Sequence, residues 1–524
     1  MMIEEKVLVA KRRHSDRSWL ILSCCLALGL IFSLFLLKHD NFIETDGCSY
    51  ALSGKNLVSG KGYTVWGRPS LWFPPSYPLA IGIFYKFMGN LELAGHTVSL
   101  ISFLISIIFL FKLARLVYNK SVAFLTVILF IMNKSVLEHS YQVWTHSLDM
   151  LLVTIIIYLA SLIIKSEKLK NRNFILLGII LAAAILNRPE NIILSSAIIL
   201  ILFIQKKEQI FRKIAAFFYL IIVLAILVLP YANFLHKHTG KWTLTTKITL
   251  LQFCEYVSYQ DPFAYEKQII PNFSEFKPFE YIMKNKRELS GRYLKGIRLF
   301  PLKLKRVLYG VFGCILIGLG LFWQAWDKDK KRIQILLLFA LSPLAILPLS
   351  DMKDRLFTFA IPIFLIWMAK GLENLSLPIK KYLNFTNRES MLAIYFVLTL
   401  LVSPIASFLA IKGNITPPLE HKQMGLWMKN NIKDIENKKI ASRKPWVAFY
   451  SGAQHTGISF KEDYNSLPGH LMQRGVDYLI IDEELIPIKR PQLKLFLDDQ
   501  KKHDGLIKEY VIRKPKKIIL YQLE

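Results

Sequence analysis

An acidic stretch follows the first long apolar segment of the chain. Glu44-Thr45-Asp46 comes soon after Trp19–Leu37, and a short helix running to Leu57 is expected to follow it. A carboxylate at the edge of an apolar segment can take a proton from a hydroxyl group, which is general-base chemistry. Asp46 can equally serve only as the cap of the short helix, because Asp and Thr are favoured cap residues. The residues alone leave both roles open.

Further ionisable residues gather where later apolar segments meet their loops. They are Arg188, Glu190, Asp351, Lys353, Asp354 and Arg355. Ionisable groups near membrane depth are costly and usually face a cavity or a partner. The cations Arg188, Lys353 and Arg355 could therefore bind a phosphate group. An internal ion pair between Arg188 and Glu190 is the alternative.

His146 and Asp149 lie near the start of the fourth apolar segment. A histidine in such a place is more often a structural residue than a ligand. None of the His, Cys or Asp residues has the spacing of a metal-binding motif. The sequence therefore predicts no certain cofactor, and a divalent metal ion stays possible.

Long apolar blocks must position these residues. Of the 524 residues, 53% are hydrophobic, and such blocks are typical of helices that cross about 30 Å of hydrocarbon. We predict a polytopic α-helical membrane protein with about eleven spans. They are Trp19–Leu37, Ala94–Phe111, Ser121–Leu137, Leu148–Ile164, Phe174–Leu186, Asn191–Ile204, Ile214–Leu229, Val307–Trp323, Ile333–Leu349, Phe357–Leu372 and Met391–Ile411.

Basic residues mark every second loop, as near Lys168, Lys207 and Lys330. Lys and Arg favour the cytoplasmic side, so we expect a multi-pass protein of the inner (plasma) membrane with a cytoplasmic N-terminus. The long segments 39–93 and 231–306 then lie outside. The formal net charge of +29 reflects these loops and contacts with lipid phosphates rather than nucleic acid.

Two shorter apolar features need their own interpretation. The arms of Phe174–Ile204 flank Asn187-Arg188-Pro189-Glu190 and span only about 20 Å each at 1.5 Å per residue. We predict a hairpin whose tip is recessed in a cavity open to the outer face. Tyr77–Gly89 is too short to cross alone, so we place it as a juxtamembrane or re-entrant element.

The composition changes near Lys412. We predict a transmembrane domain over 1–411 and an extracytoplasmic α/β domain over 412–524. The expected strands and helices alternate, as in small α/β domains. The expected strands are Trp446–Tyr450, Val476–Ile481 and Lys517–Tyr521, and the expected helices are Pro418–Asn431 and Pro491–Leu497.

Six stretches occur in an order that resembles a known superfamily. They are DGCSYALSGKNLVSGKGY, FPPSYPL, NRPEN, DRLFTFAIPIFLIWMAKGL, ASRKPWVAFYSGA and GVDYLIID. The chain resembles the GT-C membrane glycosyltransferases. Its nearest branch looks like the bacterial proteins related to protein O-mannosyltransferases and lipid A aminoarabinose transferases.

The resemblance implies transfer of a sugar from a polyprenyl-phosphate donor to a lipid, glycan or protein acceptor on the outer face of the membrane. The family's catalytic base falls on Asp46, and Arg355 matches an arginine placed to contact the donor phosphate. The family's second acidic position falls on His146, so Asp149 or Glu138 could take that role. Pro74 stands where the aminoarabinose branch has lysine, which argues against assuming that branch's substrate.

The expected mechanism is a single displacement that inverts the anomeric centre. The phosphate leaves as an anion, so cations can stabilise the developing charge without a general acid. Glu44, His146, Asp149, Glu190 and Asp351 are further candidates for a second polar or acidic site. Two alternatives stay open: a transporter or flippase of lipid-linked substrates, and a non-catalytic envelope assembly factor with the same fold.

Overall fold

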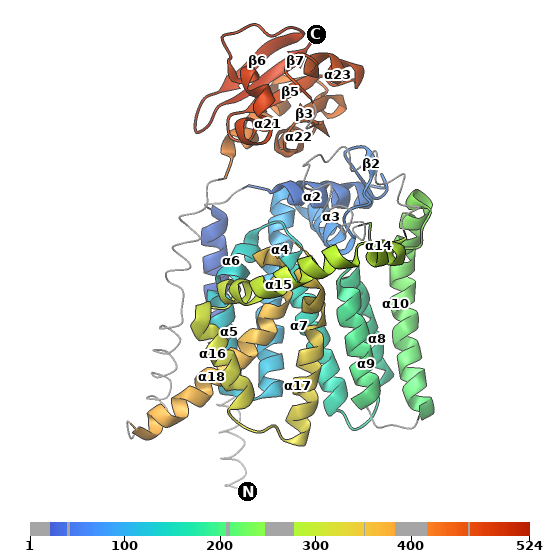
Figure 1. Cartoon of the computed structure of the whole chain (residues 1–524), viewed down its shortest axis with the longest axis vertical. Helices are drawn as coiled ribbons and strands as arrows, with labels where there is room; N and C mark the ends of the chain where they lie inside the picture. Colours follow the sequence, from blue (N-terminus) through green and yellow to red (C-terminus); the bar gives the residue numbers. More distant parts are fainter. Residues whose placement is uncertain are drawn as a thin grey trace. The chain divides into compact units, whose positions relative to one another are not determined.

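The computed structural model describes residues 21–38, 42–205, 210–246, 277–350, 352–382, 417–459 and 462–524 (Figure 1). The chain divides into two compact units, and each is described by itself. Unit 1 comprises Met1–His39, His96–Pro230 and Ile282–Ile415. Unit 2 comprises Asp40–Gly95, Tyr231–Tyr281 and Thr416–Glu524. The α4 and α10 helices each contribute residues to both units.

Unit 1 is a bundle of apolar helices, as expected from the sequence. Its helices are Ile21–Lys38, α4 (Leu91–Val117), α5 (Lys120–Met132), α6 (Lys134–Tyr141), α7 (His146–Lys165), α8 (Asn171–Ile185), α9 (Asn191–Gln205), α10 (Ile210–Thr239), α15 (Lys286–Val307), α16 (Gly310–Phe322), α17 (Lys328–Ala340), η3 (Ser342–Leu349), η4 (Asp354–Ala360) and α18 (Ile361–Tyr382). The short α14 (Pro278–Lys284) precedes α15.

The described part of the chain holds six helices long and apolar enough to cross a membrane, or up to eight if each of two bent pairs counts as one span. The bent pairs are α5 with α6, at 65°, and α15 with α16, at 95°. The α8 and α9 helices are shorter apolar helices that match the predicted hairpin. A helix stands at each span predicted before Leu372, whereas Met391–Ile411 lies outside the described residues.

Small residues bring α16 and α18 into backbone contact. A Cβ atom added to Gly320 would lie 1.9 Å from the carbonyl oxygen of Trp367. One added to Gly371 would lie 2.0 Å from the carbonyl oxygen of Leu316. Because the hydrophobic effect does not drive helices together within lipid, such close packing is a main source of helix association.

The first long loop contributes two helices to unit 2: α2 (Thr45–Val58) and α3 (Ser76–Met88). A small hairpin of β1 (Thr64–Val65) and β2 (Arg68–Pro69) lies between them in sequence. Glu44 precedes α2 and makes no side-chain cap bond, and Asp46 lies inside the first turn. Asp46 is therefore not the helix cap that the sequence allowed. The predicted juxtamembrane element is α3, which ends at Gly89.

Two glycines hold α2 and α3 together. A Cβ atom on Gly54 would lie 2.1 Å from the carbonyl oxygen of Pro78, and one on Gly82 would lie 2.4 Å from the carbonyl oxygen of Gly54. Neither atom can be accommodated unless the two backbones separate. The glycines therefore fix the direction of α2 and of the Asp46 that it carries.

We expect Gly54→Ala to destabilise the protein by about 1–3 kcal/mol, because the added methyl group overpacks the contact between α2 and α3. Thermal unfolding of the purified protein in detergent measures the loss. Gly318→Ala is the matched control, since a Cβ atom at Gly318 meets nothing within 4 Å. Equal stability of the two variants would contradict the close packing.

The C-terminal segment forms a small α/β fold within unit 2. Its strands are β3 (Lys439–Ser442), β4 (Gln454–Gly457), β5 (Tyr478–Asp482), β6 (Leu506–Ile512) and β7 (Ile518–Leu523), and its helices are α21 (Leu419–Asn431), η5 (Ile435–Asn437), α22 (Trp446–Ser451), α23 (Leu467–Gln473), α24 (Ile486–Lys489) and η6 (Pro491–Leu497). The sheet has the order β4-β3-β5-β7-β6. The β3 strand pairs in parallel with β4 and β5, and β7 pairs antiparallel with β5 and β6.

One predicted strand is wrong. Trp446–Tyr450 belongs to the helix α22, which starts after Pro445 and ends at Gly452 with φ +86°. A proline at the start and a left-handed glycine at the end are helix boundary signals. The apolar residues of this short run are buried on both sides, so their hydrophobicity did not distinguish a strand from a helix.

Candidate active site

Arg188 is the centre of a buried polar cluster in unit 1. It lies between α8 and α9, and its exposed fraction is 8%. The guanidinium donates from Nε to Glu190 over 2.8 Å, and its second nitrogen lies 2.6 Å from the same carboxylate oxygen. It also lies 2.7 Å from Nδ1 of His146. Because a guanidinium only donates, Nδ1 of His146 accepts, and a neutral ring then carries its proton on Nε2.

Asp149 completes the buried charges of this cluster. One carboxylate oxygen lies 3.8 Å from Nε of Arg188. The other accepts a hydrogen bond of 2.7 Å from the amide of Asn191, and the amide of Asn187 lies 3.5 Å away. The ion pair that the sequence offered as an alternative is therefore formed, with Asp149 as a further partner of Arg188.

The η4 helix brings Arg355 to the same end of unit 1. Thr358 on η4 lies 3.2 Å from Nδ1 of His146, the nitrogen that faces Arg188. The guanidinium of Arg355 lies over the ring of Trp144, with 5.2 Å between its central carbon and the ring centroid. Lys353 precedes η4 and is exposed. Asp351 lies outside the described residues.

His139 is a member of this neighbourhood that sequence reasoning missed. Its ring lies 4.5 Å from that of His146 and 5.3 Å from that of Trp144, measured between centroids. The side chain is buried, and neither ring nitrogen has a hydrogen-bond partner among the described residues. Glu138, the proposed substitute for a second acid, instead lies 3.8 Å from Lys134. A single histidine in an apolar segment does not reveal from sequence that it packs against His146 and Trp144.

Asp46 has a cationic neighbour within unit 2. Lys444, from the loop before α22, donates to the hydroxyl of Thr45 over 3.1 Å. Burial, followed by the nearby Arg443, lowers the pKa of Lys444, while the carboxylates of Glu44 and Asp46 act in the opposite direction. The start of α2 is thus a site where a half-buried carboxylate and a half-buried ammonium group interact. A carboxylate is also favoured there by the helix dipole.

A second network ties the C-terminal fold to the first loop. The hydroxyl of Tyr450 donates to Glu92 over 2.6 Å and accepts from the backbone amide of Ile43 over 3.1 Å. Lys422 forms an ion pair of 2.7 Å with the same carboxylate. Burial and the adjacent Glu92 raise the pKa of Tyr450 well above its usual range. These partners are hundreds of residues apart in sequence, so no spacing could have revealed them.

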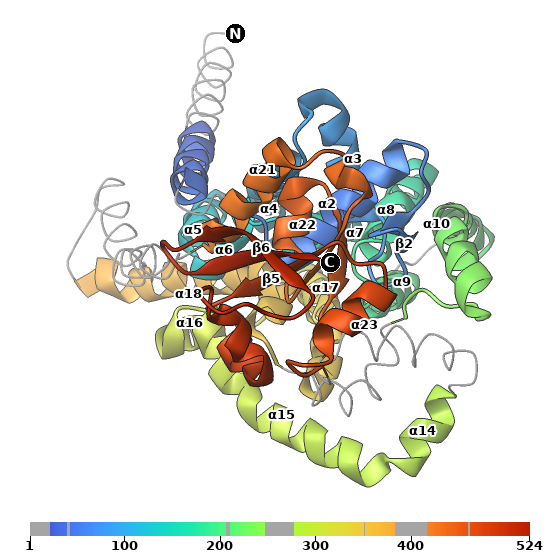
Figure 2. The same cartoon turned by 90° about the horizontal axis from the view of Figure 1, so that it is seen from above.

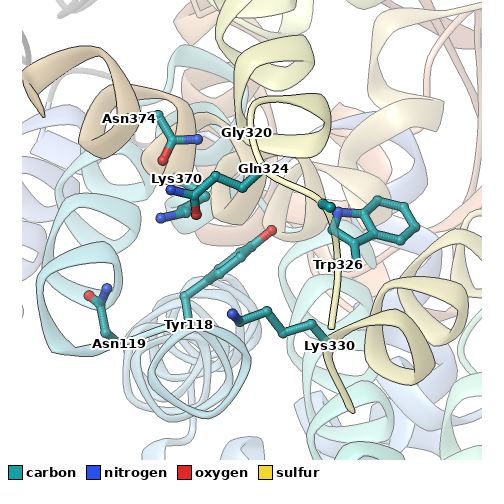
Figure 3. A pocket seen from close by; sticks show the side chains of 9 residues that line it. Tyr118, Asn119, Gly320, Gln324, Trp326, Lys330, Lys370 and Asn374 are labelled. Carbon is teal, nitrogen blue, oxygen red and sulfur yellow. The ribbon is translucent and has the colours of Figure 1, made fainter. Parts of the chain in front are cut away.

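The described residues contain no group of three or more His, Cys, Asp or Glu side chains that could hold a metal ion. A cavity of about 170 Å³ in unit 1 is lined by Tyr118, Asn119, Gly320, Gln324, Ala325, Trp326, Lys330, Lys370 and Asn374 (Figure 3). Lys370 and Lys330 pair there with Glu373 and Asp327. This cavity lies next to the start of α17, at one end of the span Lys328–Leu349. Arg355 follows the other end of the same span, so the cavity is not the candidate site.

Comparison with known proteins gives the fold. Residues 73–232 match the family model described as dolichyl-phosphate-mannose-protein mannosyltransferase. Over 97% of this chain and 98% of the other, the structure resembles ArnT from Cupriavidus metallidurans in the apo state, with a TM-score of 0.63 and 11% identity. The chain has the GT-C fold. The predicted helical membrane fold and the resemblance are therefore confirmed, whereas the count of about eleven spans stays a prediction.

Two other solved structures share the GT-C fold. The apo Archaeoglobus fulgidus oligosaccharyltransferase aligns with a TM-score of 0.60 and 12% identity, over 90% of this chain and 72% of that one. ArnT from Cupriavidus metallidurans bound to undecaprenyl phosphate aligns with a TM-score of 0.58 and 11% identity, over 96% and 98% of the two chains. No curated protein sequence matches the chain.

The matched family range contains only some of the candidate residues. His146, Asp149, Arg188 and Glu190 lie within residues 73–232, and Asp46 lies outside them. The later cations Lys353 and Arg355 also fall beyond the matched range. Roles for these outer residues therefore rest on the sequence motifs and on the geometry within each unit.

Proposed function

We propose that this protein is a glycosyltransferase that moves a sugar from a polyprenyl-phosphate donor to an acceptor hydroxyl on a lipid, glycan or protein. The GT-C fold over nearly the whole chain is the observation that carries the proposal. The solved structures with this fold include ArnT bound to undecaprenyl phosphate and the archaeal oligosaccharyltransferase AglB in complex with dolichol-phosphate. Both of those ligands are polyprenyl phosphates.

The proposed reaction is one direct displacement. The acceptor oxygen bonds to the anomeric carbon as Asp46 removes its proton, and the bond from that carbon to the phosphate oxygen breaks. The electron pair leaves with the polyprenyl phosphate, so the anomeric centre inverts. Arg188, Lys353 and Arg355 are assigned to the phosphate, where fixed cations stabilise the charge that develops on the leaving group.

The test is an assay with lipid-linked sugars extracted from membranes. Purified protein in liposomes is supplied with polyprenyl-phosphate sugars of defined types, and the consumption of each is followed by mass spectrometry. The proposal expects one donor type to be converted into free polyprenyl phosphate and a glycosylated acceptor. Movement of an intact donor across the bilayer without conversion would instead identify a flippase.

The orientation is part of the proposal: a cytoplasmic N-terminus, an extracytoplasmic C-terminal fold, and residence in the inner (plasma) membrane. Basic loops near Lys168, Lys207 and Lys330 support it. We expect an impermeant thiol reagent applied to intact cells to label a cysteine introduced at Gly452 and to spare one at Lys330. The reverse labelling pattern would overturn the outward-facing reaction.

Arg355→Ala should lower donor use about ten- to a hundred-fold, because a charge-assisted contact to phosphate is worth about 1.5–3 kcal/mol. The change is expected in the KM for the donor, measured with the extracted-lipid assay. Arg212→Ala, which removes an exposed cation from α10, is the matched control. If Arg355→Met transfers sugar normally while Arg355→Ala misfolds, Arg355 serves only to pack against Trp144.

A further inference from the structure

The α15 helix runs across the helices of unit 1 rather than along them. It meets α16 at a bend of 95°. Figures 1 and 2 show it lying crosswise at one end of the unit and reaching outward from the bundle. The α16 helix, which begins at Gly310, continues into the apolar bundle. Because an apolar span ends at the membrane surface, a helix that lies crosswise at its end lies at the membrane interface.

One face of α15 is fixed to unit 1. A Cβ atom on Gly296 would lie 2.3 Å from the carbonyl oxygen of Pro348 in η3, so the two backbones touch. The ring of Phe300 lies 5.3 Å from that of Phe357 on η4. Lys303 forms an ion pair of 3.0 Å with Asp354. The helix is therefore held in a defined rotation, and its remaining surface points away from η3 and η4.

The remaining surface has an apolar flank and a basic flank, and the exposed Leu299 and Leu302 lie among the cations of the basic flank. At 100° per residue, Leu294, Ile297 and Pro301 share one side, which we term the apolar flank. Leu294 and Ile297 are 57% and 46% exposed. The basic flank consists of Lys295, Arg298 and Arg306, all exposed, and none of them forms an ion pair with another described residue.

The apolar flank would be costly in water, and the two flanks together suit the boundary between lipid tails and headgroups. Exposed Leu and Ile side chains gain about 1.5–3 kcal/mol each when fully buried. Lys and Arg can extend their charged ends toward phosphates while their stems stay among apolar groups. Throughout α15, Lys and Arg greatly outnumber acidic residues, of which Glu288 is the only one. Such a helix typically lies in the plane of the membrane interface.

We infer that α15 lies in the headgroup layer and that its basic flank binds the phosphodiester headgroups of anionic phospholipids in the surrounding bilayer. The occupant is lipid rather than a soluble protein, because the apolar flank continues from the end of an apolar span. This surface is separate from the phosphate-binding role proposed for Arg188 and Arg355. It anchors the segment that packs on η3 and η4.

The depth of the two flanks is the first test. Spin labels are attached to single cysteines at Ile297 and at Lys295, in full-length protein whose five native cysteines have been replaced, in liposomes that contain phosphatidylglycerol. We expect the label at Ile297 to collide mainly with dissolved oxygen, and the label at Lys295 to collide mainly with an aqueous nickel complex. Aqueous collisions at both positions would overturn the placement of α15 in the interface.

Lipid selectivity is the second test. Native mass spectrometry measures how many phosphatidylglycerol and phosphatidylcholine molecules stay bound when both are supplied equally. Each cation near an anionic surface is worth about fivefold in lipid affinity. The triple variant Lys295→Gln/Arg298→Gln/Arg306→Gln should therefore lower the preference for phosphatidylglycerol by up to about a hundredfold.

Two controls make the result specific. Lys494→Gln/Lys502→Gln/Lys514→Gln removes the same charge from exposed positions of the C-terminal fold and should leave the preference unchanged. Undecaprenyl phosphate is titrated in parallel. An unchanged preference in the α15 variant, or weaker binding of undecaprenyl phosphate alone, would overturn the inference, the latter by making α15 a donor-docking surface.

Discussion

Asp46→Asn should give a folded protein that binds its donor and transfers almost no sugar. The amide keeps the size and the helix position of the side chain but takes up no proton at neutral pH. Loss of a general base typically costs about 10²–10⁴ in rate, whereas loss of a carboxylate at a helix N-terminus costs only about 0.3–1 kcal/mol of stability. Single-turnover transfer and thermal unfolding, measured on the same preparation, separate the two effects.

The control for Asp46 is its neighbour. Glu44→Gln changes a carboxylate that makes no side-chain cap bond to α2, so we expect transfer within a few-fold of the parent. Lys444→Met removes the ammonium group near Thr45 and tests its electrostatic interaction with Asp46. Near-normal transfer by Asp46→Asn would move the search for the base to Glu44 or Asp149.

Arg188→Met should destabilise the protein by about 3–5 kcal/mol, because it leaves the buried carboxylate of Asp149 without its cation. Met keeps an apolar stem of similar length, so lost packing contributes little. The unfolding temperature in detergent reports the change. Donor binding should fall as well, if Arg188 contacts the donor phosphate.

A double variant separates those two effects. Arg188→Met/Asp149→Asn removes the uncompensated charge and should recover much of the lost stability, since contacting residues couple strongly. If Arg188 contacts the donor phosphate, donor binding stays weak in the double variant although its stability is recovered. Recovery of both stability and transfer would show that Arg188 serves only the internal ion pair with Glu190 and Asp149.

Much of unit 1 could be predicted because lipid imposes a simple rule. A span must be long, apolar and internally hydrogen-bonded, so hydropathy alone placed α7 (His146–Lys165) and the hairpin of α8 and α9 within a few residues. The bend of 95° between α15 and α16 was not predicted from the sequence. The predicted span Val307–Trp323 took the apolar run but not the basic, amphipathic helix that leads into it.

The water-exposed part was harder, since its contacts connect distant parts of the chain. Sequence patterns gave β5 and β7 approximately, but they missed β3, β4 and β6, and α22 was taken for a strand. The partners Glu92, Lys422 and Tyr450 were not found, because each is an ordinary residue until folding brings the three together. Arg188 and Asp46 were singled out because charge beside an apolar segment is rare enough to draw notice.

The position of β7 in its sheet has a consequence for how the protein is made. Ile518–Leu523 lies between β5 and β6, so β6 has no neighbouring strand in the sheet until residues 518–523 have been synthesised. Yet α2, which carries Asp46, is among the earliest helices to be synthesised. Its Thr45 accepts a hydrogen bond from Lys444, which belongs to the C-terminal fold that is made late. During synthesis α2 therefore lacks its cationic neighbour Lys444 until most of the chain has been translated. A nascent chain that stalled before residue 444 would carry Asp46 without this cationic neighbour, and one that stalled before β7 would carry β6 unpaired.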